Sequence, residues 1–266
     1  MSITLSSHHL IVQRDIEIFR HLEDFKALSL DQIWALFFNH RAEAVIEHLF
    51  LTKRGTTYGY ENPAYKRLSK LARFGYLEHS FQLGFPHIYR LGPKGHYLLR
   101  NLGKSKFKHL PPWPKELEHA LLSAALGIVF SKNLNLEVIP ERHLLSHRWV
   151  SVRSKEPYKN LPLPDMEIMN QGRKYRVELE LSEKSHQKYL SIWKRLGQSV
   201  RESEPSVLYV VRDQCMMNKI LRLAGGTFYF PGIYAARLDE FRTHLGQTAW
   251  KNYKGKEFRF EDIRNN

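Results

Sequence analysis

Cysteine and long apolar runs are what this sequence of 266 residues lacks most clearly. The single cysteine, Cys215, excludes an intrachain disulfide and a cysteine-based zinc site. It lies beside Met216 and Met217, and we predict that it is buried in the core. No apolar run is long enough to cross a bilayer, and no apolar stretch follows a basic start, so we expect neither membrane insertion nor a secretory signal. These absences predict a cytoplasmic protein.

Two common signatures of catalytic chemistry are also missing. Gly225-Gly226 is not followed by the Gly-Lys-Ser/Thr of a phosphate-binding loop, so the sequence does not support ATP-driven work. The histidines have no spacing that suits a zinc site built from histidine alone. Any catalytic activity of this chain must therefore rely on side chains other than those of a phosphate-binding loop or a histidine zinc site.

Positive charge, in contrast, is abundant. Lysine and arginine number 41 against 27 aspartate and glutamate, which gives a formal net charge of +14. Such an excess favours a polyanionic partner, because neutralising phosphates releases condensed counterions. Charge alone does not separate nucleic acid from an anionic membrane surface. Hydrophobic residues make up 42% of the chain, enough for a core in each of two domains.

The first hundred residues contain a series of well-marked helix starts. Ser29 and Gln32 form a capping box, and Asn62 followed by Pro63 is typical of an N-cap and a first helical position. Helices are predicted at 13–25, from residue 29 onward, and at 42–51, 62–74 and 93–99, and the helix at 42–51 lies within an insertion (40–61). Strands are predicted at 76–79 and 87–91.

This order of helices followed by a hairpin is that of a winged helix-turn-helix. Lys66, Lys70 and Arg73 recur at helical spacing on the third helix of the unit, where they would face the major groove of duplex DNA. An ordinary solvated face is the alternative explanation of this stripe. Winged helices often dimerise, so a homodimer on an inverted-repeat site is a further expectation. The residues predicted to contact DNA are Lys66, Arg67, Lys70, Arg73, Arg90 and Lys94.

A basic, proline-containing segment separates the two halves of the chain. Its prolines argue against a continuing helix, so we predict an extended linker. The predicted domains are residues 1–103, the linker 104–115 and a second domain at 116–266. In the second half, helices are expected at 116–130, 183–201, 215–223 and 238–250, and strands at 136–139, 149–152, 164–169, 174–181, 207–211 and 227–234, with a polar tail from 251. The fold class is therefore α+β, an N-terminal winged helix followed by an α/β domain with a mixed central sheet.

An acidic hairpin is the part of this second domain that bears on chemistry. If strands 164–169 and 174–181 pair through the Asn170-Gln171-Gly172 turn, Asp165 comes close to Glu178 and Glu180. Carboxylates crowded together suit Mg²⁺ or Mn²⁺, which would polarise a phosphate and acidify a bound water. Lys184 would stabilise the developing charge. An exposed acidic face on an amphipathic hairpin remains the alternative.

The pattern Pro164-Asp165…Glu178-x-Glu180…Lys184 resembles the PD-(D/E)xK nuclease signature, in the variant with a second glutamate in place of the lysine. The chain is also similar to the replication-relaxation family of mobile-element proteins, which includes the MOB-C class of conjugative relaxases. The segments that carry this likeness, in addition to the nuclease-like pattern, are Arg14-Asp15-Ile16, Tyr65-Lys66-Arg67-Leu68 and Glu-Leu-Glu-Leu-Ser-Glu-Lys. The likeness covers most of residues 10–200.

The resemblance implies a restriction-endonuclease-like domain that nicks one strand of duplex DNA at a transfer origin with Mg²⁺ or Mn²⁺, by hydrolysis. Asp165 and Glu178 would be metal ligands, Glu180 and Lys184 would complete the catalytic site, and Glu118 matches a further acid of such nucleases. Plasmid mobilisation by conjugation would add coupling and relaxosome proteins as partners. Glu180 stands where the usual lysine is expected, and this departure puts activity in doubt.

Other functions stay open at this level. The relaxases that use alternating histidines are disfavoured, because no two of the 14 histidines stand two positions apart. Tyr189 is a possible nucleophile, although core packing is the more common role of such an aromatic residue. A non-catalytic origin-binding replication or transcription regulator is the main alternative, and a transposon end-nuclease is disfavoured by the order of its domains.

Overall fold

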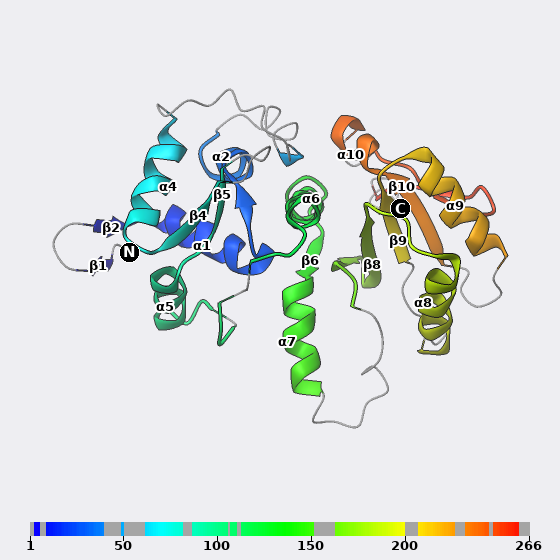
Figure 1. The fold of residues 1–266 in the computed structure, drawn as a ribbon, viewed down its shortest axis with the longest axis horizontal. Coiled ribbons are helices and arrows are strands. Elements are labelled where there is room, and N and C mark those ends of the chain that lie inside the picture. Colours follow the sequence, from blue (N-terminus) through cyan, green and yellow to red (C-terminus); the bar gives the residue numbers. More distant parts are fainter. Residues whose placement is uncertain are drawn as a thin grey trace. The chain divides into compact units, whose positions relative to one another are not determined.

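The computed structural model describes residues 3–5, 9–39, 49–50, 62–81, 87–105, 107–110, 113–151, 163–199, 207–226, 232–244 and 247–260. The chain divides into two compact units, Met1–Ala125 and Leu126–Asn266 (Figure 1). Helices and strands alternate in both units, and the larger sheet contains parallel and antiparallel strands, so the expected mixed α+β class is confirmed. Most of the helix predicted at 42–51 lies outside the described residues.

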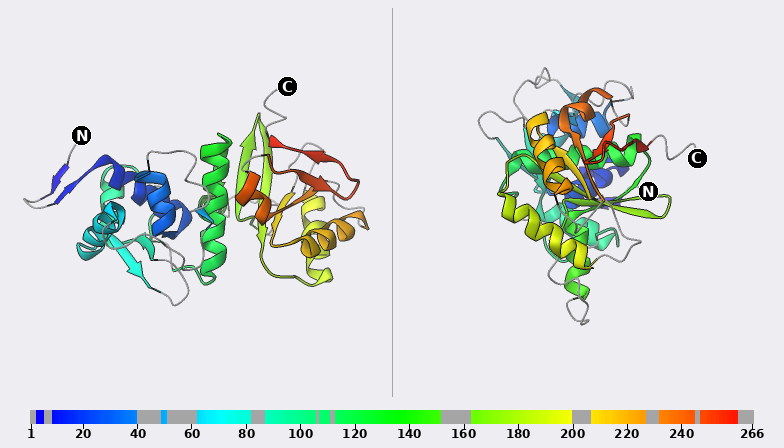
Figure 2. Two further views of the ribbon diagram at one scale, coloured as in Figure 1. Left: turned by 90° about the horizontal axis from the view of Figure 1, so that it is seen from above. Right: turned by 90° about the vertical axis from the view of Figure 1, so that its right-hand side faces the viewer.

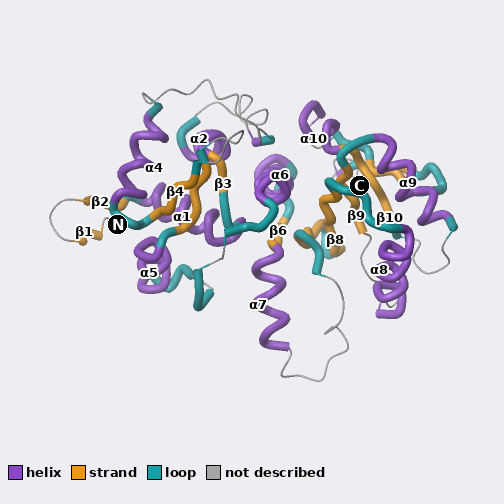
Figure 3. Tube along the Cα trace, viewed as in Figure 1, coloured by secondary structure: helices purple, strands orange, loops and turns teal. Residues whose placement is uncertain are grey.

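The N-terminal unit combines helices with a small antiparallel sheet (Figure 3). Its sheet has the strand order β3-β5-β4, and a separate hairpin, β1-β2, precedes it. The elements are β1 (Ile3–Leu5), β2 (His9–Ile11), α1 (Gln13–Phe25), β3 (Leu28–Ser29), α2 (Leu30–Phe37), α4 (Pro63–Arg73), β4 (Leu77–Ser80), β5 (Ile88–Leu91) and α5 (Pro93–Asn101). These bounds match the helices and the hairpin that the sequence predicts.

Two of the predicted helix starts have the expected hydrogen bonds. The Gln32 amide N–H donates to Ser29 Oγ (3.1 Å), and the Ser29 amide N–H donates to Gln32 Oε1 (3.0 Å), which is the predicted capping box. Gln32 also donates from Nε2 to the Leu121 carbonyl (2.8 Å). Asn62 Oδ1 accepts the Ala64 amide N–H (2.8 Å) in front of Pro63. Both caps satisfy amide groups that the first turn of a helix leaves unpaired.

The segment predicted as a linker packs on the N-terminal unit wherever it is described. Ser105 Oγ donates to Glu23 Oε1 (2.7 Å), and the Lys108 carbonyl lies 3.3 Å from His96 Nε2. Trp113 packs against the cluster that contains Ala27, Ile88, Leu117 and Leu121. The division between the units falls inside α6 (Leu117–Ile128), C-terminal to the boundary that the prolines predict.

The C-terminal unit is a seven-stranded sheet in the order β12-β11-β10-β9-β8-β7-β6. Strands β8, β9 and β10 are parallel, and the other pairs are antiparallel. After α6 come η1 (Val129–Asn133), β6 (Glu137–Pro140), α7 (Glu141–Ser151), β7 (Met166–Asn170), β8 (Arg173–Glu180), α8 (His186–Ser199), β9 (Val207–Val211), α9 (Gln214–Gly225), β10 (Ile233–Arg237), α10 (Leu238–His244), β11 (Trp250–Asn252) and β12 (Glu257–Phe258).

Both faces of this sheet are covered. Helices α8 and α9 lie over one face (Figure 2). On that face Tyr189 and Trp193 pack with Tyr209 in a core cluster. On the other face the ring of Phe130 meets those of Phe241 and Phe260 edge-on. The strand run Val207–Val211 is buried at every position, as the sequence predicts for a central strand.

Several predictions for the second half are wrong. Residues 149–151 belong to helix α7, which begins at Glu141, rather than to a strand, because one β-branched residue, Val150, does not interrupt a helix. Helix α10 ends at His244, and Trp250 begins β11, where its ring packs on Phe241 (5.6 Å between centroids). The expected polar tail therefore contains two sheet strands. Cys215 is exposed, because the buried stripe of α9 starts with Met216 and Met217.

Candidate functional site

The acidic hairpin forms with the predicted turn. Gln171 and Gly172 have φ angles of 48° and 75°, the left-handed pair that a two-residue hairpin turn needs. The register pairs Met166 with Val177, so Asp165, one residue earlier, lies opposite Glu178, one residue later. Since β7 runs antiparallel to β8, both carboxylates lie at the edge where the parallel strands have their carboxyl ends, a common place for ligand sites.

Asp165 and Glu178 interact electrostatically at this edge. Asp165 Oδ2 accepts the Leu179 amide N–H (2.7 Å), which fixes the aspartate beside β8. Burial, together with the neighbouring charge of Asp165, raises the pKa of Glu178 to about 8, although Lys184 and Arg176 act in the opposite direction. A carboxyl group with this pKa is largely protonated at neutral pH, unless a cation binds to it.

Glu180 and Lys184 form an ion pair at the end of the same strand. The Glu180 side chain is buried, and the Lys184 ammonium donates to its Oε2. Lys184 Nζ also lies 6.0 Å from the centroid of the Tyr189 ring. The lysine therefore reaches back from the connection between β8 and α8 to the buried Glu180 at the end of β8.

The predicted metal set is brought together only in part. Asp165, Glu178, Glu180 and Lys184 lie in the C-terminal unit, whereas Glu118 lies on the part of α6 that belongs to the N-terminal unit. Within the described ranges, no three histidine, cysteine, aspartate or glutamate side chains are placed as ligands of one metal ion. The pair Asp165 and Glu178 is thus the centre of the candidate site.

Aromatic side chains form the wall of the site on the face covered by α8. Tyr209 pairs with Glu178 across the strands, and Trp193 Nε1 donates to the Tyr209 hydroxyl (3.0 Å). Tyr189 is only 1% exposed and its ring lies 5.7 Å from that of Trp193, so it is a core residue and is not accessible as a nucleophile. Burial and the nearby Glu180 raise the pKa of Tyr189.

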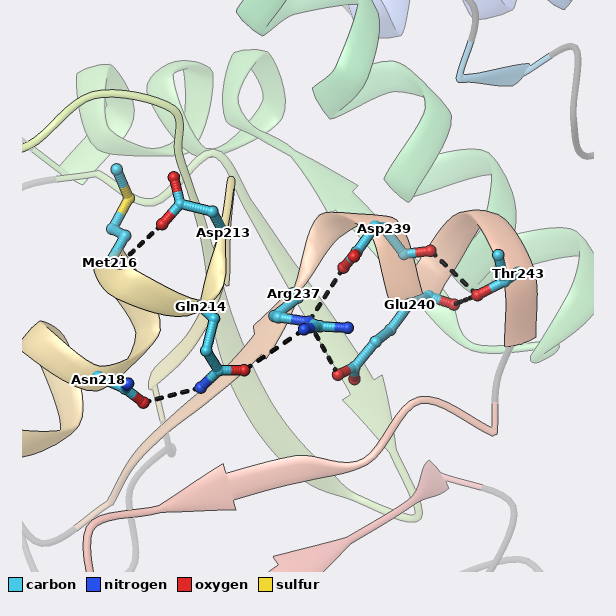
Figure 4. Close-up of polar contacts among 8 residues, drawn as sticks. All are labelled: Asp213, Gln214, Met216, Asn218, Arg237, Asp239, Glu240 and Thr243. Carbon is cyan, nitrogen blue, oxygen red and sulfur yellow. Dashed lines mark hydrogen bonds and ion pairs between the residues drawn. The ribbon is translucent and has the colours of Figure 1, made fainter.

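A second polar cluster occupies the carboxyl ends of β9 and β10 (Figure 4). Arg237 Nε lies 3.1 Å from Asp239 Oδ1 and 3.2 Å from Glu240 Oε1, and its Nη1 lies 3.5 Å from Gln214 Oε1. Asp213 caps α9, since its Oδ1 accepts the Met216 amide N–H (2.9 Å). These contacts fix the starts of α9 and α10 to one sheet edge. These contacts were not predicted from the sequence, although an aspartate two residues after a buried strand is a recognisable N-cap signal.

In the N-terminal unit, the predicted DNA-contacting residues fall into two groups. Lys66, Lys70, Arg73 and Lys94 are exposed, and the first three share one face of α4. Arg67 instead donates from Nε to the fully buried Asp15 (3.0 Å). Arg90 donates from Nε to Glu78 Oε2 (2.7 Å) and its guanidinium stacks 4.7 Å from the ring centroid of Trp113.

Comparison with family models, curated proteins and solved structures finds no match to this chain. The described helices include none that is long and apolar enough to cross a membrane.

Proposed function

We propose that this protein binds duplex DNA through its N-terminal unit and nicks one strand with its C-terminal unit, at the origin of a mobile element. The first half of the proposal is supported by the order α1, β3, α2, α4, β4, β5 and by the sheet order β3-β5-β4, which are those of a winged helix. In that fold α4 is the recognition helix. Its exposed face carries Lys66, Lys70 and Arg73, and the whole helix contains no acidic residue.

The two other arginines of the predicted DNA surface have a structural role in this proposal. Arg67 joins α4 to α1 through Asp15, and Arg90 joins the two strands of the wing through Glu78. Their charge is neutralised within the unit. The four other residues, Lys66, Lys70, Arg73 and Lys94, are exposed, and the proposal assigns the contacts with phosphate to them.

The observation that carries the second half is the crowding of Asp165 and Glu178 at the carboxyl edge of the sheet. Burial, together with the charge of Asp165, raises the pKa of Glu178 to about 8, and such a pair of carboxylates fits a divalent cation, because the ion offsets both the burial of charge and the repulsion. A bound Mg²⁺ or Mn²⁺ supplies the charge that polarises a scissile phosphate and makes water more acidic.

The chain's own residues complete the site. Asp165 is oriented by the Leu179 amide, and Lys184 brings a positive charge toward the phosphate from the connection that follows β8. Glu180 holds that lysine at the strand end. Hydrolysis at this site would leave no covalent link to the protein, in keeping with the burial of Tyr189.

The test is the conversion of a supercoiled plasmid that carries the origin region into open circles, with and without Mg²⁺ or Mn²⁺. We expect metal-dependent nicking by the wild type and a loss of at least about a hundredfold in Asp165→Asn and Glu178→Gln, since each removes a charge from the metal site. Glu183→Gln is the matched control, because Glu183 is exposed and pairs with Lys219 on α9. Equal nicking by all variants would refute the site assignment.

A non-catalytic origin-binding regulator is the second candidate function. One observation favours it: Glu180 and Lys184 form an ion pair with each other. Two of the four residues assigned to the nuclease signature are therefore bound to one another. Tight, salt-sensitive binding of the origin without nicking in either metal would support it.

A further inference from the structure

Helix α5 has an exposed face with the same charge as that of α4. Lys94, Tyr97 and Arg100 are exposed at intervals of three residues, while Leu98 and Leu99 are buried on the opposite side. Tyr97 is 67% exposed and, with Phe81, is one of the two large hydrophobic side chains that the described residues leave open to solvent. The helix contains no aspartate or glutamate. A lone aromatic ring between two cations is a poor water-facing surface but a good contact for nucleic acid.

The start of α5 is fixed to the end of α4 by close backbone contacts. The Lys94 amide N–H donates to the Gly75 carbonyl (3.1 Å), and the Gly92 amide N–H donates to the Tyr76 carbonyl (2.8 Å). There is no room for a side chain at this junction, since a Cβ on Gly92 would lie 2.6 Å from the Gly75 carbonyl oxygen. The two helices therefore keep one fixed relation to each other.

The exposed face of α5 begins at this junction with Lys94. The aliphatic part of Lys94 lies over Gly75, within 3.6 Å of the position that a Cβ would take there, and Arg73 is the last residue of α4, two positions before Gly75. Lys66, Lys70 and Arg73 are thus exposed on α4 and Lys94 and Arg100 on α5, with Lys94 at the junction between the two helices. At a rise of 1.5 Å per residue, each of these two sets of cations spans roughly 10 Å, more than the distance between neighbouring phosphates of one strand.

We propose that the Lys94–Tyr97–Arg100 face of α5 is a second DNA-contacting surface, which binds the sugar-phosphate backbone of the duplex next to the segment held by α4. Lys94 and Arg100 bind phosphates, and the Tyr97 ring packs on the sugar between them. The inference rests on the proposed duplex binding by the N-terminal unit, which it extends beyond the recognition helix and the wing.

The test measures the affinity of the full chain for a fluorescein-labelled random-sequence duplex over a series of salt concentrations. We expect Lys94→Ala/Arg100→Ala to lower the slope of log K against log salt by about two, one for each lost phosphate contact. Tyr97→Ala should weaken duplex binding about threefold or more without changing that slope. Arg20→Ala is the matched control, because Arg20 is an exposed arginine of α1, outside both α4 and α5, and should leave the slope unchanged.

A Lys66→Ala/Lys70→Ala variant separates the two proposals. If it loses duplex binding while Lys94→Ala/Arg100→Ala keeps the wild-type slope, the α5 surface is refuted and the role of α4 stands. If neither variant changes the slope, duplex binding by this unit is itself refuted. A Tyr97→Ala protein that loses binding only to a labelled thymidine single strand would overturn the duplex assignment and show stacking on unpaired bases. Because all these side chains are exposed, unchanged thermal unfolding confirms that the variants are folded.

Discussion

Asp31 in the first turn of α2 gives a quantitative test of the packing in the N-terminal unit. Its side chain is fully buried, and among the described residues no other residue forms a hydrogen bond with either carboxylate oxygen. Burial raises the pKa of Asp31 from 3.8 to about 6. The charged form is therefore the unfavourable one in the folded protein.

The sign of the pH dependence follows from this direction. Because the folded-state pKa lies above the unfolded one, the folded protein binds the proton more tightly, and the contribution of Asp31 to stability falls as the pH rises from 3.8 to about 6. Two pKa units at 1.36 kcal/mol each correspond to about 3 kcal/mol. Above about pH 6 the destabilisation of the folded protein by the charged Asp31 carboxylate no longer changes with pH.

The perturbation is Asp31→Asn, which keeps the shape and removes the charge. We expect the variant to gain about 3 kcal/mol relative to the wild type at pH values above about 7, and this gain to disappear near pH 4. The assay is hydrogen exchange in the α2 segment, with both proteins compared at the same pH so that the intrinsic exchange rate cancels. Glu17→Gln on the exposed face of α1 is the control and should change nothing. A gain that is the same at both pH values would refute the reasoning.

Three further predictions test other contacts. Arg67→Met leaves the fully buried Asp15 without its partner and should cost about 3 kcal/mol in denaturant unfolding; a loss below about 1 kcal/mol would mean that the pair is not desolvated. Gly95→Ala places a Cβ 2.4 Å from the Tyr76 carbonyl oxygen and should cost about 2 kcal/mol, seen as a lower melting temperature, whereas an unchanged melting temperature contradicts this close approach. Cys215 is exposed, so a thiol reagent should label it in the native protein, and labelling only after unfolding would show that it is buried.

Local signals in the sequence determined much of the N-terminal unit. The capping box at Ser29 and Gln32 and the Asn62-Pro63 start involve residues at most three positions apart, so their geometry depends little on the rest of the fold. The turn at Gln171-Gly172 is local in the same way, and it fixed the register that places Asp165 opposite Glu178. That register is what made the acidic pair predictable.

The misassigned elements lie where local preference and tertiary packing disagree. Residues 238–250 have a helical pattern, but the Trp250 ring is buried against Phe241 and the residues after it pair with β10 and β12 as sheet strands. Sheet pairing of this kind joins positions far apart in the chain, so no short window of sequence contains it.

Only the tertiary structure decided which charged residues are available for binding. Arg67 and Lys70 lie one helical turn apart on α4 with the same charge, but Arg67 is turned toward the buried Asp15 while Lys70 is exposed. In the same way Lys184 is one of several lysines after the acidic strand, and its contact with Glu180 singles it out. The sequence determines how many charges a helix carries and at what spacing, whereas the packing of that helix against its neighbours determines which of them are neutralised within the protein and which remain for a partner.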